Sequence, residues 1–212
     1  MSAPLFSREF SCPSCGGPIP QKFPGTRTLL CPYCGQTSHL NADNLEMVGE
    51  KQMLIDYGSE LEIGQQYRLV PMKDTPIIIL GRLRIDYEDG FWDEWFAQTL
   101  DEGKPLWIQE DDGQFVVFQE REGIDDLLSY ENARVGYKTR MGEGIPEVLI
   151  TSKSRAKVNG GEGELPFRVI PGDPADFVEG MAKGRIVSAE LLPGERHLFV
   201  GTPITLEALQ PV

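Results

Sequence analysis

Short apolar runs separated by turn residues dominate the chain from residue 67 onward. These runs are rich in Val, Ile, Phe, Tyr and Trp, and Gly, Asp or Pro bounds each of them, which is the pattern of β-strands. Asp89-Gly90 and Asp112-Gly113 stand between apolar runs, where they indicate tight hairpins. We therefore expect strands over Tyr67–Val70, Pro76–Tyr87, Phe91–Thr99, Pro105–Glu110, Gln114–Glu120, Val135–Arg140, Glu147–Thr151, Ala156–Asn159, Phe167–Ile170, Arg185–Leu192, His197–Gly201 and Ile204–Leu206.

Helical periodicity is confined to short stretches. In Ile124–Tyr130 the apolar residues Ile124, Leu127 and Leu128 fall at i, i+3 and i+4, and Pro174–Gly180 is a second candidate for a helical turn. Many short strands with little helix are typical of all-β domains. The sequence therefore predicts a mostly β body, either an antiparallel β-sandwich or a partly open β-barrel.

Charge is distributed unevenly along the chain. The formal net charge is −13, yet residues 1–40 contain three basic residues and one acidic residue, so residues 41–212 carry −15. An acidic body repels a polyphosphate, which argues against sequence-independent binding of nucleic acid. It suits a basic protein surface or a polycation, although excess acid that keeps a protein soluble explains the same composition.

Nothing in the hydropathy pattern predicts a membrane span or a secretory leader. The longest apolar runs, such as Ile77–Leu80, are far shorter than a transmembrane helix. The first residues also lack the charged-then-apolar pattern of a signal peptide. A reducing, cytoplasmic location is therefore expected, and it suits free thiolates.

The four cysteines of the chain occur as two copies of Cys-Pro-x-Cys-Gly. Their C-x₂-C-x₁₅-C-x₂-C spacing lets two turns present four thiolates to one tetrahedral zinc ion, as in a closed structural site. A glycine after each pair can take the positive φ that a sharp knuckle requires. We predict one structural zinc ion bound by Cys12, Cys15, Cys31 and Cys34.

Other interpretations of these residues are possible. Cys31-Pro32-Tyr33-Cys34 alone resembles the redox-active pair of glutaredoxins, but such a pair begins a helix, whereas a turn composition follows this one. A disulfide framework is disfavoured because no secretory signal is present. His39 lies near the second knuckle and could replace a cysteine ligand, although an ordinary place in the ribbon is the simpler interpretation.

The order of the segments predicts three parts. Residues 1–42 form a zinc ribbon, in which the strand Thr26–Leu30 joins the two knuckles. Residues 43–123 and 124–212 form a first and a second β half, packed as one body. Asn159–Pro166 is rich in glycine and acid, and we expect it to be a hairpin loop.

Trp92-Asp93-Glu94-Trp95 is the first candidate site outside the cysteines. On a regular strand Trp92 and Glu94 share one face and Trp95 lies on the other, so both indoles are core only if a bulge separates them. We treat Trp92, Glu94 and Trp95 as a candidate ligand or partner surface that would suit a cation. Ordinary sheet packing explains the same residues.

The nearby acids form a second candidate. The acidic cluster Asp86, Glu88, Asp89, Asp93 and Glu94 would suit a divalent cation or a polyamine, although solvated acids at a hairpin tip are the plain alternative. The sequence contains none of the common hydrolase, metalloprotease or dinucleotide motifs. We therefore assign no catalytic residue and favour a non-enzymatic protein without excluding an enzyme.

Several short motifs together resemble the bacterial DUF4178 family, whose biochemical activity is unassigned. They are the two Cys-Pro-x-Cys-Gly knuckles, Ile79–Arg82, Trp92-x-Glu94-Trp95 and Gly161–Pro166. The resemblance spans roughly residues 60–205, with the ribbon as a common N-terminal companion. It implies a β-rich fold and an association with membrane-stress proteins of the phage-shock-protein-A type, small integral-membrane proteins and polyamine-synthesis enzymes. It implies no catalytic residues.

These observations lead to two hypotheses. The first is a cytoplasmic, non-enzymatic adaptor with one structural zinc ion. It would work in a membrane-stress or other membrane-associated assembly and reach the inner membrane peripherally, through a protein partner. The second is a binder of a polyamine or other cationic small molecule, or an enzyme acting on one, through the tryptophan and acidic region.

Overall fold

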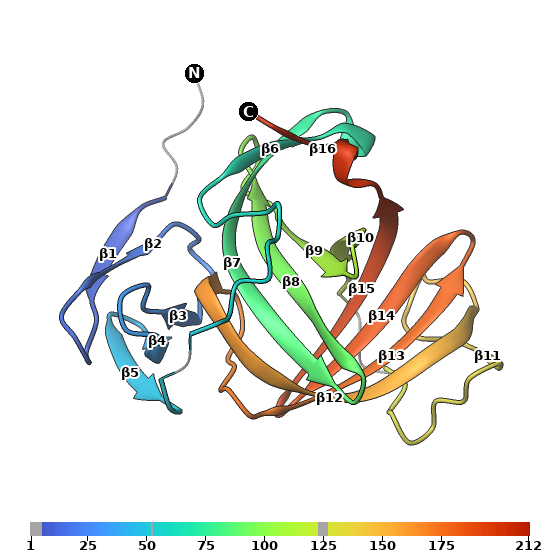
Figure 1. Cartoon of the computed structure of the whole chain (residues 1–212). Coiled ribbons are helices and arrows are strands. Elements are labelled where there is room, and N and C mark those ends of the chain that lie inside the picture. Colours follow the sequence, from blue (N-terminus) through green and yellow to red (C-terminus); the bar gives the residue numbers. More distant parts are fainter. Residues whose placement is uncertain (1–5, 52, 123–126) are drawn as a thin grey trace.

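The structure, a computed structural model, describes residues 6–51, 53–122 and 127–212 (Figure 1). Strands make up nearly all of its secondary structure, so the prediction of a mostly β fold is confirmed. The helical elements of the described chain are two single 3₁₀ turns, η1 (Val70–Met72) and η2 (Leu206–Ala208).

Eight of the described strands close into an antiparallel barrel. Four consecutive strands from each predicted half form a meander, and the two meanders are joined where β10 pairs with β15 and β12 pairs with β7. Closure removes the open edges that a sandwich would keep. The barrel strands are β7 (Thr75–Tyr87), β8 (Gly90–Thr99), β9 (Pro105–Asp111), β10 (Gln114–Glu120), β12 (Val148–Leu165), β13 (Pro174–Ala182), β14 (Arg185–Leu192) and β15 (Glu195–Ile204).

Close strand contacts explain one error of the sequence analysis. Asn159–Pro166 was expected to be a hairpin loop, but β12 continues through Leu165. A Cβ atom would lie 2.7 Å from the Arg82 carbonyl oxygen at Gly161 and 2.2 Å from the Leu80 carbonyl oxygen at Gly163. These glycines therefore mark a close approach of β12 to β7 and not a turn.

Other predicted elements also differ. Residues 148–151 of the predicted strand Glu147–Thr151 and all of Ala156–Asn159 belong to the single strand β12. Pro174–Gly180 is part of strand β13 and not a helical turn. Phe167–Ile170 is irregular, and Val135–Arg140 shrinks to β11 (Lys138–Thr139). The predicted helix Ile124–Tyr130 lies partly outside the described residues, and its described residues 127–130 are not helical.

The N-terminal strands form a small unit beside the barrel, which we call the ribbon (residues 6–48). Its strand β3 pairs with the end of β12, so the sheet of the ribbon continues into the barrel wall. The hairpin of β4 and β5 turns at residue 42, where the sequence analysis had separated ribbon from body. The ribbon strands are β1 (Arg8–Ser11), β2 (Pro18–Gln21), β3 (Thr28–Leu30), β4 (Thr37–Asn41) and β5 (Asn44–Val48).

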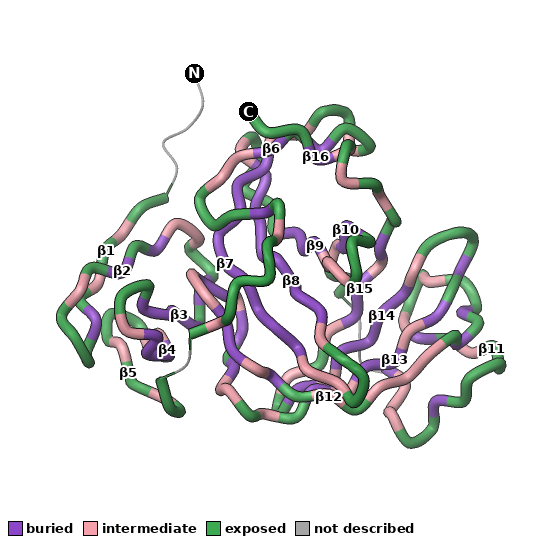
Figure 2. Tube along the Cα trace, in the orientation of Figure 1, coloured by how far each residue is buried: buried purple, intermediate pink, exposed green. Residues whose placement is uncertain are grey.

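The barrel wall is buried on both faces over much of its length. Side chains from all eight strands fill the interior. Residues 61–69 and the C-terminal strand cover the outer face of β7–β9, and residues 127–141 cover that of β12–β15. Figure 2 shows β7 and β8 buried along most of their length. The covering strands are β6 (Gln66–Leu69) and β16 (Leu209–Pro211).

Candidate metal centre

The four cysteine sulfurs of the ribbon lie within 4.8 Å of one another and could hold a metal ion. The Sγ atoms of Cys12 and Cys34 are 3.8 Å apart, and those of Cys15 and Cys31 are 3.6 Å apart. A tetrahedral ion with metal–sulfur bonds of about 2.3 Å separates its ligands by about 3.8 Å. The side chains therefore fit one four-coordinate ion, and all four cysteines are free thiols.

Two equivalent turns hold the sulfurs in place. Gly16 donates its N–H to the Cys12 carbonyl oxygen at 2.8 Å, and Gly35 donates to that of Cys31 at 3.0 Å. The two glycines have φ values of 76° and 67°, in the left-handed region that glycine tolerates. The sequence predicted this repetition of one knuckle because each Cys-Pro-x-Cys is followed by glycine.

The environments of the thiols differ before a metal binds. Burial raises the pKa of Cys31 to about 12, whereas the backbone N–H of Gln36 lowers the pKa of Cys34 to about 7. A bound cation favours the thiolate form of every ligand. Binding of a metal ion would therefore release a proton from the buried Cys31 thiol.

His39 is not part of this centre. It lies on β4, and its Nε2 atom is 3.2 Å from the carbonyl oxygen of Val169, a residue that follows β12. The side chain is nearly buried between the ribbon and the barrel. The simpler interpretation of this histidine, an ordinary place in the ribbon, is the one that the structure supports.

A buried carboxylate fastens the ribbon to the barrel. Glu164, near the end of β12, accepts hydrogen bonds from the backbone N–H groups of Lys22 and Phe23 at 2.9 and 3.1 Å. It also accepts one of 2.6 Å from Thr26 Oγ1. Burial raises the pKa of this carboxyl group, and the three donors oppose that shift. Sequence reasoning missed this role because Glu164 stands in a glycine-rich segment that has the composition of a loop.

Aromatic packing completes the attachment. The ring of Phe23 meets Phe96 of β8 edge-on, with centroids 5.2 Å apart, and Leu30 of β3 belongs to the same interior core. Phe167, just after β12, stacks on Trp107 inside the barrel. Side chains from the ribbon and from the segment beside it therefore pack at one end of the barrel interior and attach the ribbon to the barrel core.

Comparison with protein-family models, curated proteins and solved structures found no match. The resemblance to the DUF4178 family thus stays a prediction. In the part of the chain that is described, no helix has the length and apolar character needed to cross a membrane.

The structure places Trp92, Glu94 and Trp95 in the interior, so the predicted ligand or partner surface is wrong. All three are at least nine-tenths buried. No bulge separates the two indoles. Instead, Trp92 faces the barrel interior, where its Nε1–H bonds Glu94, while Trp95 faces the outer core and donates to Glu110, both at 2.9 Å. The prediction failed because a layer outside the barrel buries the second face of β8.

Asp93, which stands between Trp92 and Glu94 in the sequence, forms ion pairs with two buried arginines of β7. Its carboxylate accepts bonds from Arg82 Nη2 at 2.6 Å and from Arg84 Nε and Nη2, both at 2.8 Å. Arg84 also lies over the rings of Tyr57 and Phe91, with its Cζ atom 4.8 and 4.1 Å from the ring centroids. Asp93, which the sequence analysis places in a cluster suited to a cation, is therefore already paired with Arg82 and Arg84 of the chain itself.

Carboxyl groups also point into the barrel. Glu94 on β8 and Glu190 on β14 lie on opposite walls of the interior and are nine-tenths or more buried, with Glu179 of β13 nearby. Burial raises the pKa of Glu94 to about 7, and burial together with the charge of Glu94 raises the pKa of Glu190 well above its ordinary value. No sequence motif signals this cluster, because its members come from separate strands.

Proposed function

We propose that this protein is a non-enzymatic interaction protein whose ribbon binds one structural zinc ion. The observation that supports the zinc assignment is the set of four thiols with the sulfur separations of a closed tetrahedral site. A four-thiolate site with no open position is typical of structural zinc. The ion would stabilise both knuckles and, through Glu164 and Phe23, the end of the barrel.

The role as an adaptor is supported by the contacts that join the ribbon to the barrel and by the charge of the chain. Residues 41–212 carry −15, a field that attracts a basic protein surface. We propose that this cytoplasmic adaptor works in a membrane-associated or membrane-stress assembly, as the family resemblance implies. The contact with the inner membrane would then be peripheral.

Crosslinking in cells, followed by reconstitution from purified components, tests the adaptor role. We expect a protein partner that crosslinks reproducibly, binds the purified zinc-loaded chain and dissociates as salt is raised. The matched control is the same chain after metal removal, which should bind the partner less well. Failure to reconstitute any crosslinked complex, or turnover of an amine substrate by the purified chain, would contradict the proposal.

A surface hollow of about 500 Å³ supports cation binding as a second candidate function. Aromatic and acidic side chains share its wall, an arrangement that can bind an organic cation. The fluorescence of Trp95 should respond to binding in this hollow, because the Trp95 Nε1–H donates a hydrogen bond to Glu110, a residue that lines the hollow. The aromatic and acidic residues of this wall include Tyr57, Tyr87, Asp89, Phe91, Glu110 and Asp112.

Titration of tryptophan fluorescence with spermidine at low and high salt tests this second candidate. Saturable quenching at low salt that weakens at high salt is the expected result. Asp89→Asn, at the hairpin tip, should weaken it, while Asp43→Asn in the ribbon serves as the matched control because Asp43 lies outside the hollow. The absence of a saturable change at low salt would reject the candidate.

A further inference from the structure

The end of the molecule that bears β11 has a charge opposite to that of the chain as a whole. Residues 127–157 contain six basic and three acidic residues, within a protein of net charge −13. The β13–β14 turn lies against this segment, since Ala182, Lys183 and Arg185 line one hollow together with Glu143–Pro146. We call this region the basic end and define it by its exposed cations Arg134, Lys138, Arg140, Lys183 and Arg185.

The cations of the basic end are free to meet a partner. No ion pair within the described ranges involves any of the five. By contrast, the neighbouring Lys153 donates to the carbonyl oxygens of Tyr130 and Ala133, both at 3.2 Å. The side chains of the basic end therefore keep their full capacity to bind an anionic surface.

Apolar side chains are exposed among these cations. Lys138, Leu149 and Met181 are direct neighbours across β11, β12 and β13, so their side chains form one row on one face of the sheet. Leu149 and Met181 are each 38% exposed, and Tyr137, next to Lys138, is 65% exposed. A row that combines apolar and cationic side chains is typical of an interaction site.

We propose that the basic end binds directly to the surface of an anionic lipid membrane. Lys and Arg can bind lipid phosphates, the aliphatic side chains can enter the boundary of the acyl region, and Tyr prefers that interface. A nucleic acid duplex would satisfy the cations but offers no apolar environment for Leu149 and Met181. The inference rests on the proposed function only in placing the protein at a membrane, and it replaces a contact through a partner with a direct one.

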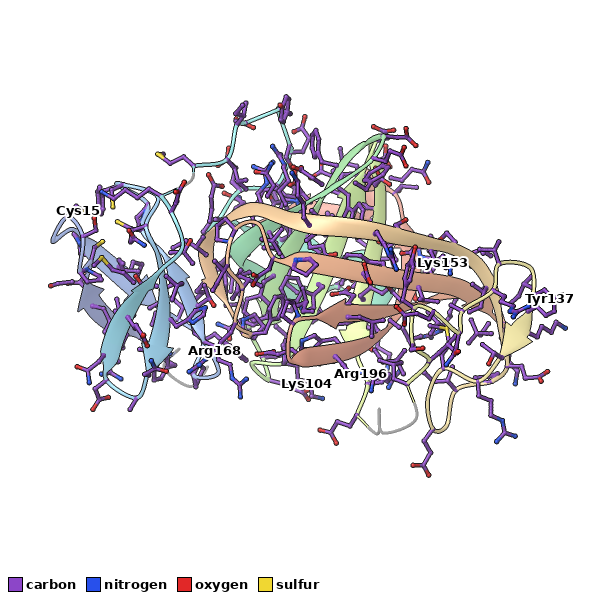
Figure 3. All side chains as sticks on the ribbon, turned by 90° about the horizontal axis from the view of Figure 1, so that it is seen from below. Cys15, Lys104, Tyr137, Lys153, Arg168 and Arg196 are labelled. Atoms are coloured by element: carbon purple, nitrogen blue, oxygen red, sulfur yellow. The ribbon has the colours of Figure 1, made fainter. Side chains whose placement is uncertain are left out.

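The basic end and the ribbon lie far apart, so the protein can bind a membrane through the basic end while the ribbon stays away from the lipid. Figure 3 shows Tyr137 and Cys15 at opposite ends of the molecule. Charges further from the lipid than about 8 Å are screened at physiological ionic strength, so the distant acidic surface does not cancel the attraction of the basic end. The ribbon would then face away from the membrane and remain accessible to a protein partner.

Sedimentation with lipid vesicles tests the proposal on the zinc-loaded full chain. We expect binding to vesicles of phosphatidylcholine mixed with phosphatidylglycerol, little binding to phosphatidylcholine alone, and release at high salt. Lys138→Glu with Lys183→Glu should weaken binding at least about tenfold. Lys51→Glu with Lys73→Glu makes the same change in net charge at other exposed positions and should change binding less than about twofold.

A second variant pair separates the apolar contribution. Leu149→Ser with Met181→Ser should weaken vesicle binding while leaving its salt dependence unchanged, and circular dichroism checks that both pairs remain folded. Equal binding to neutral and anionic vesicles, no binding, an equal loss in the control pair, or release from vesicles by a stoichiometric DNA duplex would each overturn the inference. A reconstituted protein partner without vesicle binding would reject this inference and leave the proposed function standing.

Discussion

The carboxylate of Glu164 accepts a hydrogen bond of 3.1 Å from the backbone N–H of Phe23, 141 positions earlier in the chain. This bond joins the end of strand β12 to the loop after β2 in the ribbon. The Phe23 ring then packs on Phe96 inside the barrel. A metal ion bound by the four cysteines would therefore stabilise more than the two knuckles, because the ribbon covers one end of the barrel core.

Removing the Glu164 carboxylate should destabilise the whole protein. Glu164→Ala leaves the N–H groups of Lys22 and Phe23 and the hydroxyl of Thr26 without their acceptor, at a cost on the order of 3 kcal/mol in the free energy of unfolding. Urea unfolding of the zinc-loaded protein measures the loss. Glu9→Ala is the matched control, since its side chain on β1 is exposed, and an equal loss there would contradict the role of Glu164.

Gly81→Ala should prevent correct closure of the barrel. An added Cβ would lie 2.1 Å from the backbone carbonyl oxygen of Glu164, and neither strand can move without breaking the β7–β12 pairing. We expect a loss of several kcal/mol, or insoluble protein. Gly90→Ala is the control, because its Cβ would meet only the end of the Tyr87 side chain at 3.3 Å. Similar melting temperatures for the two variants would be inconsistent with a close strand approach.

Removing only the carboxylate of Asp93 should destabilise the protein more than replacing Asp93, Arg82 and Arg84 together. Asp93→Ala leaves Arg82 and Arg84 buried without their common carboxylate, and we expect a loss of about 3–5 kcal/mol in the free energy of unfolding. Replacing the aspartate and both arginines with apolar residues of similar size should recover part of that loss. Thermal and urea unfolding measure the free energies of unfolding of the single and the triple variant. A triple variant less stable than Asp93→Ala would show that the charges themselves are required.

The interior carboxyl groups predict an unusual dependence of stability on pH. Burial raises the pKa of Glu94 to about 7, so between about pH 4.5 and pH 7 the folded chain retains a proton that the unfolded chain has released. Unfolding then releases that proton, and the free energy of unfolding falls as the pH rises through about 7. Measured on zinc-loaded protein between about pH 6 and pH 8, the fall that Glu94 contributes should be on the order of 1 kcal/mol.

Glu94→Gln should reduce this dependence, because the amide carries no titrating proton. Glu179 and Glu190, whose pKa values burial also raises, face the same interior and will leave a residual slope. Glu88→Gln at the exposed hairpin tip is the control and should leave the pH profile unchanged. A Glu94→Gln profile parallel to that of the unaltered chain would exclude Glu94 as the group responsible.

The sequence predicted local features better than features that depend on the barrel. The knuckles at Cys12 and Cys31 were predictable because spacing, proline and glycine all act within a few residues. The burial of Trp95 was not, because the pattern of one strand does not show that residues 61–69 cover its outer face. Glu164, Asp93 and Glu94 were misjudged for the same reason. Their partners come from segments distant in sequence, and only the closed barrel brings those segments together.

Native mass spectrometry of the reduced protein counts the metal ions bound to each intact chain and so shows whether the four cysteines hold zinc. We expect one zinc ion per chain, lost after chelation, together with a more open charge-state distribution as the ribbon detaches from the barrel. A metal-free chain with all four thiols reduced and the compact charge-state distribution retained would contradict it.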